Sequence, residues 1–93
     1  MTIGLLNLRL RIPENHSLKG KRQVLLSLKT RIRQRFNVSV AEVGEQDKWQ
    51  VASLAVCAVG TDQAGVNRQL SLVADLAREE AEAELIDEHM EFF

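Results

Sequence analysis

Apolar and polar side chains alternate along four stretches of the chain, and two longer stretches repeat apolar positions at the period of a helix. The first alternating stretch is residues 3–12, where every second residue from Leu6 to Ile12 is apolar. This pattern predicts a strand with one buried face. Pro13 ends the strand, because proline has no N–H to donate to a β-ladder.

The next two alternating stretches, residues 38–43 and 49–59, lie on either side of a polar turn at residues 44–48. Together they predict a β-hairpin. Both faces of residues 49–59 are largely apolar. Such a strand is either central and covered on both sides, or has one face that awaits a partner.

Two segments repeat apolar residues at the helical period. Ser17 is expected to cap the first, residues 18–36, because its hydroxyl can accept from the free amides of the first turn. Thr61 or Asp62 caps the second, which extends to about residue 80. The apolar stripes are Leu18, Val24, Leu25, Leu28, Ile32 and Phe36 in the first helix, and Val66, Leu70, Val73, Ala74 and Ala77 in the second.

A final strand at residues 83–92 completes the order βαββαβ. Right-handed crossovers place the first and third strands in the centre and both helices on one face. The sequence therefore predicts an α+β, ferredoxin-like sandwich, with a four-stranded antiparallel sheet and a single domain over residues 1–93. The last strand should lie antiparallel to the first. One of its faces is expected to carry Leu85, Asp87, His89 and Glu91, with Asp87 and Glu91 opposite Arg9 and Arg11.

Composition agrees with one folded domain: the chain has 93 residues, of which 45% are hydrophobic. No apolar run is long enough to cross a bilayer, and no charged leader precedes an apolar stretch. We therefore expect no membrane association. Cys57 is the only cysteine, which excludes an internal disulfide and favours a reducing, cytoplasmic location.

The net charge of −1 conceals a strong asymmetry. Residues 1–36 hold nine lysines and arginines against Glu14 alone, whereas residues 37–93 hold three against twelve acids. Either the first helix presents a basic surface to nucleic acid, or the two halves neutralise each other on folding. In the first case the residues that reach phosphates are Lys19, Lys21, Arg22, Lys29 and Arg33.

The sheet itself is a poor candidate for RNA binding. RNA-binding domains of this topology stack bases on aromatic residues of the two central strands. The corresponding positions here, none of them aromatic, are Leu5, Asn7, Arg9, Val51, Ser53 and Ala55.

An apolar strip on the open sheet face favours a second interpretation, a homodimer. Monomers seldom leave a large apolar patch in water, and a self-complementary contact between two copies would cover it. Alternatively, Arg9 and Arg11 drape over the face. The strip consists of Trp49, Val51, Ala55, Cys57 and Val59.

Residues with catalytic potential are few. His16 and His89 lie far apart without ligand partners at a metal-binding spacing, and Cys57 sits in an apolar strand. No phosphate-binding glycine loop is present. We therefore expect no catalytic site, no metal and no cofactor, and rank an enzyme below a binding module.

Three stretches carry a family resemblance: residues 17–22 (SLKGKR), 36–43 (FNVSVAEV) and 46–50 (QDKWQ). Together they resemble the YlxP-like family of small bacterial proteins over nearly the whole chain. The resemblance implies a ferredoxin-like fold, no established activity and no catalytic residues. Its members are often encoded beside translation and ribosome-maturation factors, which implies RNA or the ribosome as partner.

Overall fold

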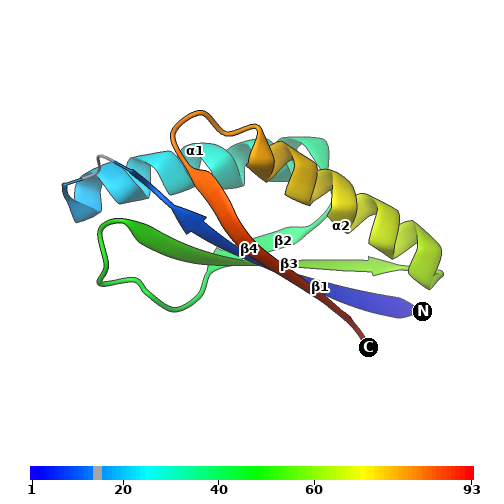
Figure 1. Ribbon diagram of the computed structural model, residues 1–93. Helices are drawn as coiled ribbons and strands as arrows, with labels where there is room; N and C mark the ends of the chain where they lie inside the picture. Colours follow the sequence, from blue (N-terminus) through cyan, green and yellow to red (C-terminus); the bar gives the residue numbers. More distant parts are fainter. Residues whose placement is uncertain (14–15) are drawn as a thin grey trace.

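A computed structural model describes residues 1–13 and 16–93 of the chain, and its elements follow the predicted order. Figure 1 shows them coloured along the sequence. The strands and helices are β1 (Thr2–Arg11), α1 (Leu18–Arg35), β2 (Ser39–Glu42), β3 (Val51–Gly60), α2 (Gln63–Arg78) and β4 (Glu84–Phe92).

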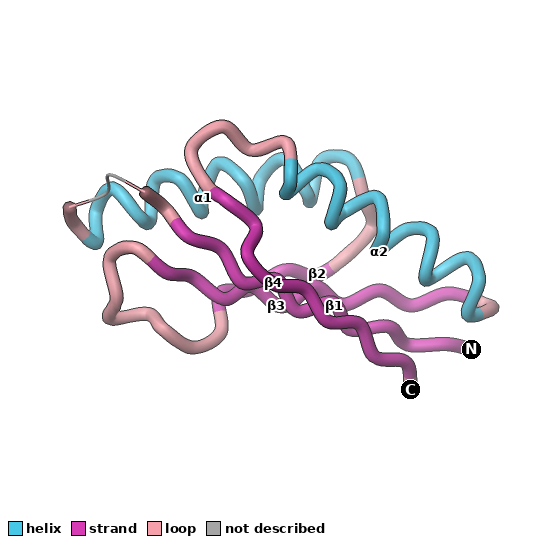
Figure 2. Tube along the Cα trace, in the orientation of Figure 1, coloured by secondary structure: helices cyan, strands magenta, loops and turns pink. Residues whose placement is uncertain are grey.

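The four strands form one antiparallel sheet in the order β2-β3-β1-β4, so the first and third strands are central, as predicted. Both helices cover the same face of this sheet, and the other face is left open (Figure 2). The α+β, ferredoxin-like prediction is therefore confirmed.

Alternation places one set of β3 side chains under the helices and the other on the open face. Ala52, Leu54, Val56 and Ala58 are buried, whereas the residues between them are partly exposed. The helix caps hold as expected: the Ser17 hydroxyl accepts from the Gly20 amide at 3.0 Å, and Asp62 caps α2 through the amide of Gly65. The predicted α2 stripe is wholly buried, and Leu76 joins it.

The third strand begins two residues later than predicted, so Trp49 and Gln50 lie in the loop after β2. The physical reason is that β1 stops opposite them. Arg11 pairs with Val51, and the Ile12 amide donates to the Gln50 carbonyl at 2.8 Å. Pro13, the next residue, already lies in a turn, so the ladder stops before Trp49. Trp49, expected within the third strand, therefore lies just before it.

The predicted assignment of β4 residues to the two faces of the sheet was also wrong in part. Arg9 lies opposite Asp87 as expected, but the register then shifts, so that Leu10 lies opposite Leu85 and Ile86 is the extra residue of a bulge. The bulge places Leu85 against the core and leaves Ile86 exposed. Arg11 consequently faces Glu84, and Glu91 faces Leu5 instead.

Candidate nucleic-acid interface

Four of the five expected phosphate-binding residues lie along one flank of α1. At 3.6 residues per turn they fall within an arc of about 80° and span about 21 Å of the helix axis. We call these residues, Lys19, Arg22, Lys29 and Arg33, the basic ridge. Lys29 is half-buried and the other three are exposed.

The basic ridge faces away from α2 and toward the edge strand β2. Arg33 donates to the Val40 carbonyl of β2 at 2.8 Å. Arg31, which projects from the opposite flank of α1, forms an ion pair with Glu80 just beyond α2. The ridge therefore lies along one long edge of the molecule, beside the short outer strand.

Basic residues elsewhere in the first part of the chain pair with acids from the second part. The pairs are Arg9–Glu45 at 2.7 Å, Arg11–Glu84 at 2.5 Å, Lys21–Glu42 at 3.1 Å, and Arg31–Glu80. No carboxylate within residues 1–13 and 16–93 forms such a pair with a ridge residue. The halves thus neutralise each other in part, and the ridge, together with Arg35, is the portion left over.

Lys21 does not belong to this surface, although it was expected to contact phosphate. Its side chain is buried, and its ammonium donates to the carbonyls of Glu45 at 2.5 Å and Lys48 at 2.8 Å and lies 3.1 Å from the Glu42 carboxylate. Two hydrogen bonds and one ion pair thus hold the Lys21 ammonium. Lys21 instead ties α1 to the loop between β2 and β3.

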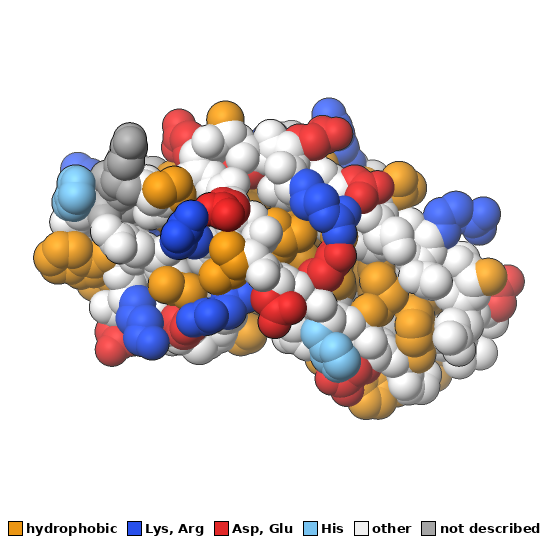
Figure 3. Space-filling model, viewed as in Figure 1, with side chains coloured by type: hydrophobic (Ala, Val, Ile, Leu, Met, Phe, Trp, Pro, Cys, Tyr) orange, Lys and Arg blue, Asp and Glu red, His pale blue; other side chains and the backbone are white. Residues whose placement is uncertain are grey.

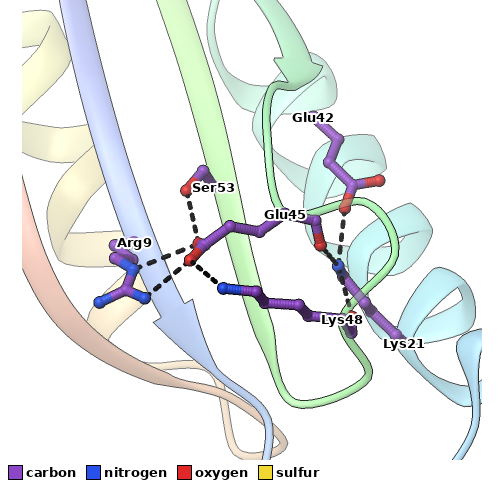
Figure 4. Close-up of polar contacts among 6 residues, drawn as sticks. All are labelled: Arg9, Lys21, Glu42, Glu45, Lys48 and Ser53. Atoms are coloured by element: carbon purple, nitrogen blue, oxygen red, sulfur yellow. Dashed lines mark hydrogen bonds and ion pairs between the residues drawn. The ribbon is translucent and has the colours of Figure 1, made fainter.

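Glu45 is the centre of that loop's polar contacts (Figure 4). Its carboxylate accepts from Arg9 at 2.7 and 3.2 Å and from the Ser53 hydroxyl at 3.0 Å on the open sheet face. Hydrogen bonds from Arg9, aided by Ser53 and by the charges of Arg9 and Lys48, lower the pKa of Glu45 to about 2. The same contact raises the pKa of the Arg9 guanidinium.

The backbone of Glu45 is as unusual as its contacts. Its φ of 55° lies in the left-handed region, which non-glycine residues seldom adopt, and Gly44 before it has a φ of 72°. Two successive left-handed residues turn the chain so that the Glu45 side chain reaches Arg9 while its carbonyl reaches Lys21. The loop is therefore fastened to both faces of the sheet.

The bridge from Arg9 through Glu45 to Ser53 crosses one end of the open sheet face, and Arg11 pairs across it with Glu84. Arg9 and Arg11, which were expected to drape over the strip, thus both pair with carboxylates. The expected apolar strip continues beyond this bridge along β3. Ala55 and Cys57 are partly exposed there, and Val59 is 61% exposed.

Acidic side chains gather on the opposite edge of the sheet from the basic ridge. On the face in Figure 3, acidic and basic side chains lie next to one another. Besides the Arg11–Glu84 pair, two contacts involve β4: Arg78 with Glu88, and His89 with Glu91 at 3.2 Å. No group of three or more histidine, cysteine or acidic residues suited to a metal ion occurs among residues 1–13 and 16–93. Within the same residues, no helix is both long and apolar enough to span a bilayer.

Sequence reasoning missed the role of Glu45 and misassigned Lys21. A signal for Lys21 was present, because it precedes Leu25 by four residues and Leu28 by seven and so shares the buried stripe of α1. Nothing comparable marks Glu45, whose partners Arg9 and Lys21 are distant in sequence.

Solved structures share the fold at low sequence identity. The de novo designed protein Foldit4 aligns with a TM-score of 0.57 at 8% identity, over 100% of this chain and 97% of its own. SnoaB, a cofactor-independent oxygenase from Streptomyces nogalater, aligns with a TM-score of 0.52 at 14% identity, over 99% and 90%. At such identities the similarity concerns the fold alone.

Sequence relatives are more informative about family. The uncharacterized protein YlxP of Bacillus subtilis (strain 168) is 42% identical over 57 residues, which are 61% of this chain and 62% of that protein. The match thus spans about three fifths of the relative's length. Residues 3–90 match the family model described as Protein of unknown function (DUF503), and the chain belongs to this family.

Proposed function

We propose that the chain is a non-catalytic binding module that holds the phosphate backbone of RNA, in the cytoplasm, along the basic ridge of α1. The observation that carries the proposal is the distribution of ion pairs. Arg9, Arg11, Lys21 and Arg31 have acidic partners, whereas Lys19, Arg22, Lys29 and Arg33 have none within the described parts of the chain.

Cations without an internal carboxylate partner are the ones that gain most from an external polyanion. A lysine or arginine that meets a phosphate releases counterions condensed on the nucleic acid, which favours binding at low salt. A cation already held by a carboxylate would first have to break that pair. The ridge therefore offers four contacts in one row, close to one another on a rigid helix.

The test is a titration of a fluorescently labelled RNA with the parent chain and with a variant carrying Arg22→Glu and Lys29→Glu. Arg22 is exposed and Lys29 is half-buried, and neither substitution removes a contact described in the fold. The parent should bind with an affinity that falls steeply with salt, with a slope of roughly −3 for four contacts to a single strand. The variant should bind at least about tenfold more weakly.

A matched control places the same change of net charge on the other helix, with Gln63→Glu, Ala64→Glu and Arg68→Glu. These three residues are exposed on α2. The control should bind like the parent, because its charges lie away from the ridge. Equal binding by the parent and the ridge variant, or equal losses in ridge variant and control, would refute the proposal.

A second candidate function is a homodimeric interaction module that uses the open sheet face. The observation that favours it is the apolar strip left uncovered beyond the Arg9–Glu45 bridge, with Val59 61% exposed at its end. A second copy is the occupant that fits best, because a patch lying across the centre of a sheet can face itself about a two-fold axis. The two functions use opposite faces of the molecule.

A further inference from the structure

We propose, building on the function above, that Trp49 is a stacking platform for an unpaired base of the bound RNA, so that the site selects single-stranded RNA. Trp49 is the only tryptophan of the chain and is 52% exposed. It lies in the loop between β2 and β3, outside the sheet.

The backbone on both sides of Trp49 is fixed. The carbonyl of Lys48 accepts from the buried Lys21 ammonium at 2.8 Å, and the carbonyl of Gln50 accepts from the Ile12 amide at 2.8 Å. The Lys48 amide also donates to the Glu45 carbonyl at 3.1 Å. A large aromatic side chain is thus presented to solvent from an anchored position rather than from a loose loop, which reduces the ordering cost of a contact.

The fold brings this tryptophan to the beginning of the basic ridge. β1 ends, β3 begins and α1 begins at the same end of the molecule, as Figure 1 shows. Lys21 makes the connection, because its backbone lies in the first turns of α1, between Lys19 and Arg22, and its ammonium holds the Lys48 carbonyl. Trp49 therefore lies within about one side-chain length of the helix turn that carries the first two ridge residues.

The surroundings of Trp49 are suited to a flat ring. An open hollow of ≈ 510 Å³ is lined by Asp47, Lys48, Trp49, Gln50 and Val51. Lys48, with a side chain that is 60% exposed, also lines the hollow, and its ammonium lies 3.8 Å from the Glu45 carboxylate. A cationic track with an aromatic platform beside it is the arrangement that binds single strands without reading their sequence.

Duplex RNA offers the same phosphates but keeps its base faces stacked inside the helix. The ridge alone would therefore bind both forms, and Trp49 would favour the single strand. This difference separates the stacking role of Trp49 from the electrostatic role of the ridge.

The experiment uses the full chain and two probes of equal length, oligo(U) and a fully paired RNA. Because Trp49 is the only tryptophan, its fluorescence reports on this position alone. We expect oligo(U) to quench it and the duplex to leave it nearly unchanged. Trp49→Ala should weaken oligo(U) binding about tenfold with duplex binding unchanged, and Trp49→Phe should restore part of the loss.

Each outcome bears on a distinct claim. Binding of oligo(U) without quenching, or equally tight binding by Trp49→Ala, overturns the stacking role and leaves the ridge proposal standing. Binding of neither probe by the parent, or undiminished binding by the ridge variant, overturns the proposed function and the stacking role with it. Circular dichroism of Trp49→Ala checks that the exposed substitution has not unfolded the chain.

Discussion

Single residues with uncommon roles cluster in the loop between β2 and β3. Glu45 adopts a left-handed backbone and still makes polar contacts with four residues. Lys21 is a buried lysine whose ammonium is held by this loop. Strained residues of this kind persist only where the surroundings fix them from several sides. Both residues therefore act together to hold the segment that presents Trp49.

At residue scale, Glu45 predicts a pH dependence of stability. Its pKa is lowered in the folded chain to about 2 from an ordinary value of 4.5, so folding favours the charged form. The stabilisation is therefore complete above about pH 5 and is lost as the pH falls toward about 2. Urea unfolding of the parent and of Glu45→Gln should show a difference in unfolding free energy that shrinks across this window. A difference that is the same at both ends would contradict the assignment.

What the sequence predicted at this scale depended on local pattern. Ser17 was recognised as a helix cap because a cap requires only a hydroxyl just before a helical stripe. The contacts of Glu45 join residues 36 and 24 positions away, and no local spacing encodes such pairings. Lys21 was assigned by its charge, although its position in the buried stripe pointed to the interior.

At the scale of elements, the packing of α2 on β1 depends on a glycine. A Cβ at Gly4 would lie 2.4 Å from Val66 Cγ1 and 2.8 Å from Leu70 Cδ1. Gly4→Ala should therefore destabilise the fold by about 1–3 kcal/mol, because α2 has to move away from the sheet. Alanine is otherwise more favourable than glycine in a strand. Any loss of stability in Gly4→Ala therefore reports the clash between the new Cβ and α2. Denaturant unfolding is the measurement.

The double variant Gly4→Ala with Val66→Ala tests the cause. Removing the Val66 methyl groups makes room for the new Cβ, so the double variant should lose less stability than the two single losses added together. Strict additivity would show that Gly4 is required for some other reason than the approach of α2.

Elements were predicted to within a few residues, and the errors have a common origin. The prediction began β3 two residues too early and assigned Leu85 to the wrong face of β4. In both cases the pairing with the neighbouring strand determined the observed structure. β1 ends at Arg11, and its last bond toward β3 is the one from Ile12 to Gln50, so Trp49 lies in the loop. A bulge at Ile86 lets Leu85 and Met90 both pack on the core, although a spacing of five would separate them in a regular strand.

At the scale of the whole molecule, charge and apolar surface are separated by the sheet order β2-β3-β1-β4. The basic ridge flanks the β2 edge, and the acidic residues of β4 lie at the opposite edge. The small net charge of −1 therefore coexists with a strong asymmetry, which would orient an approaching polyanion toward α1. The open apolar strip lies on the face that the helices leave uncovered.

This separation allows a dimer to form without hiding the ridge, and the dimer can be tested on its own. If two copies pair through their open faces, light scattering should give about twice the chain mass of 10.5 kDa. Ala55→Glu, at the centre of β3, should return the mass to that of one chain, because it buries a charge in the interface. Leu72→Glu, an exposed position of α2, is the control and should leave the mass unchanged. A parent that stays monomeric at high concentration would refute the dimer.

A dimer through the open faces would display two ridges on its outer surfaces. A long RNA that reaches both ridges should then bind the parent more tightly than Ala55→Glu. An RNA too short to reach both should bind the parent and Ala55→Glu equally.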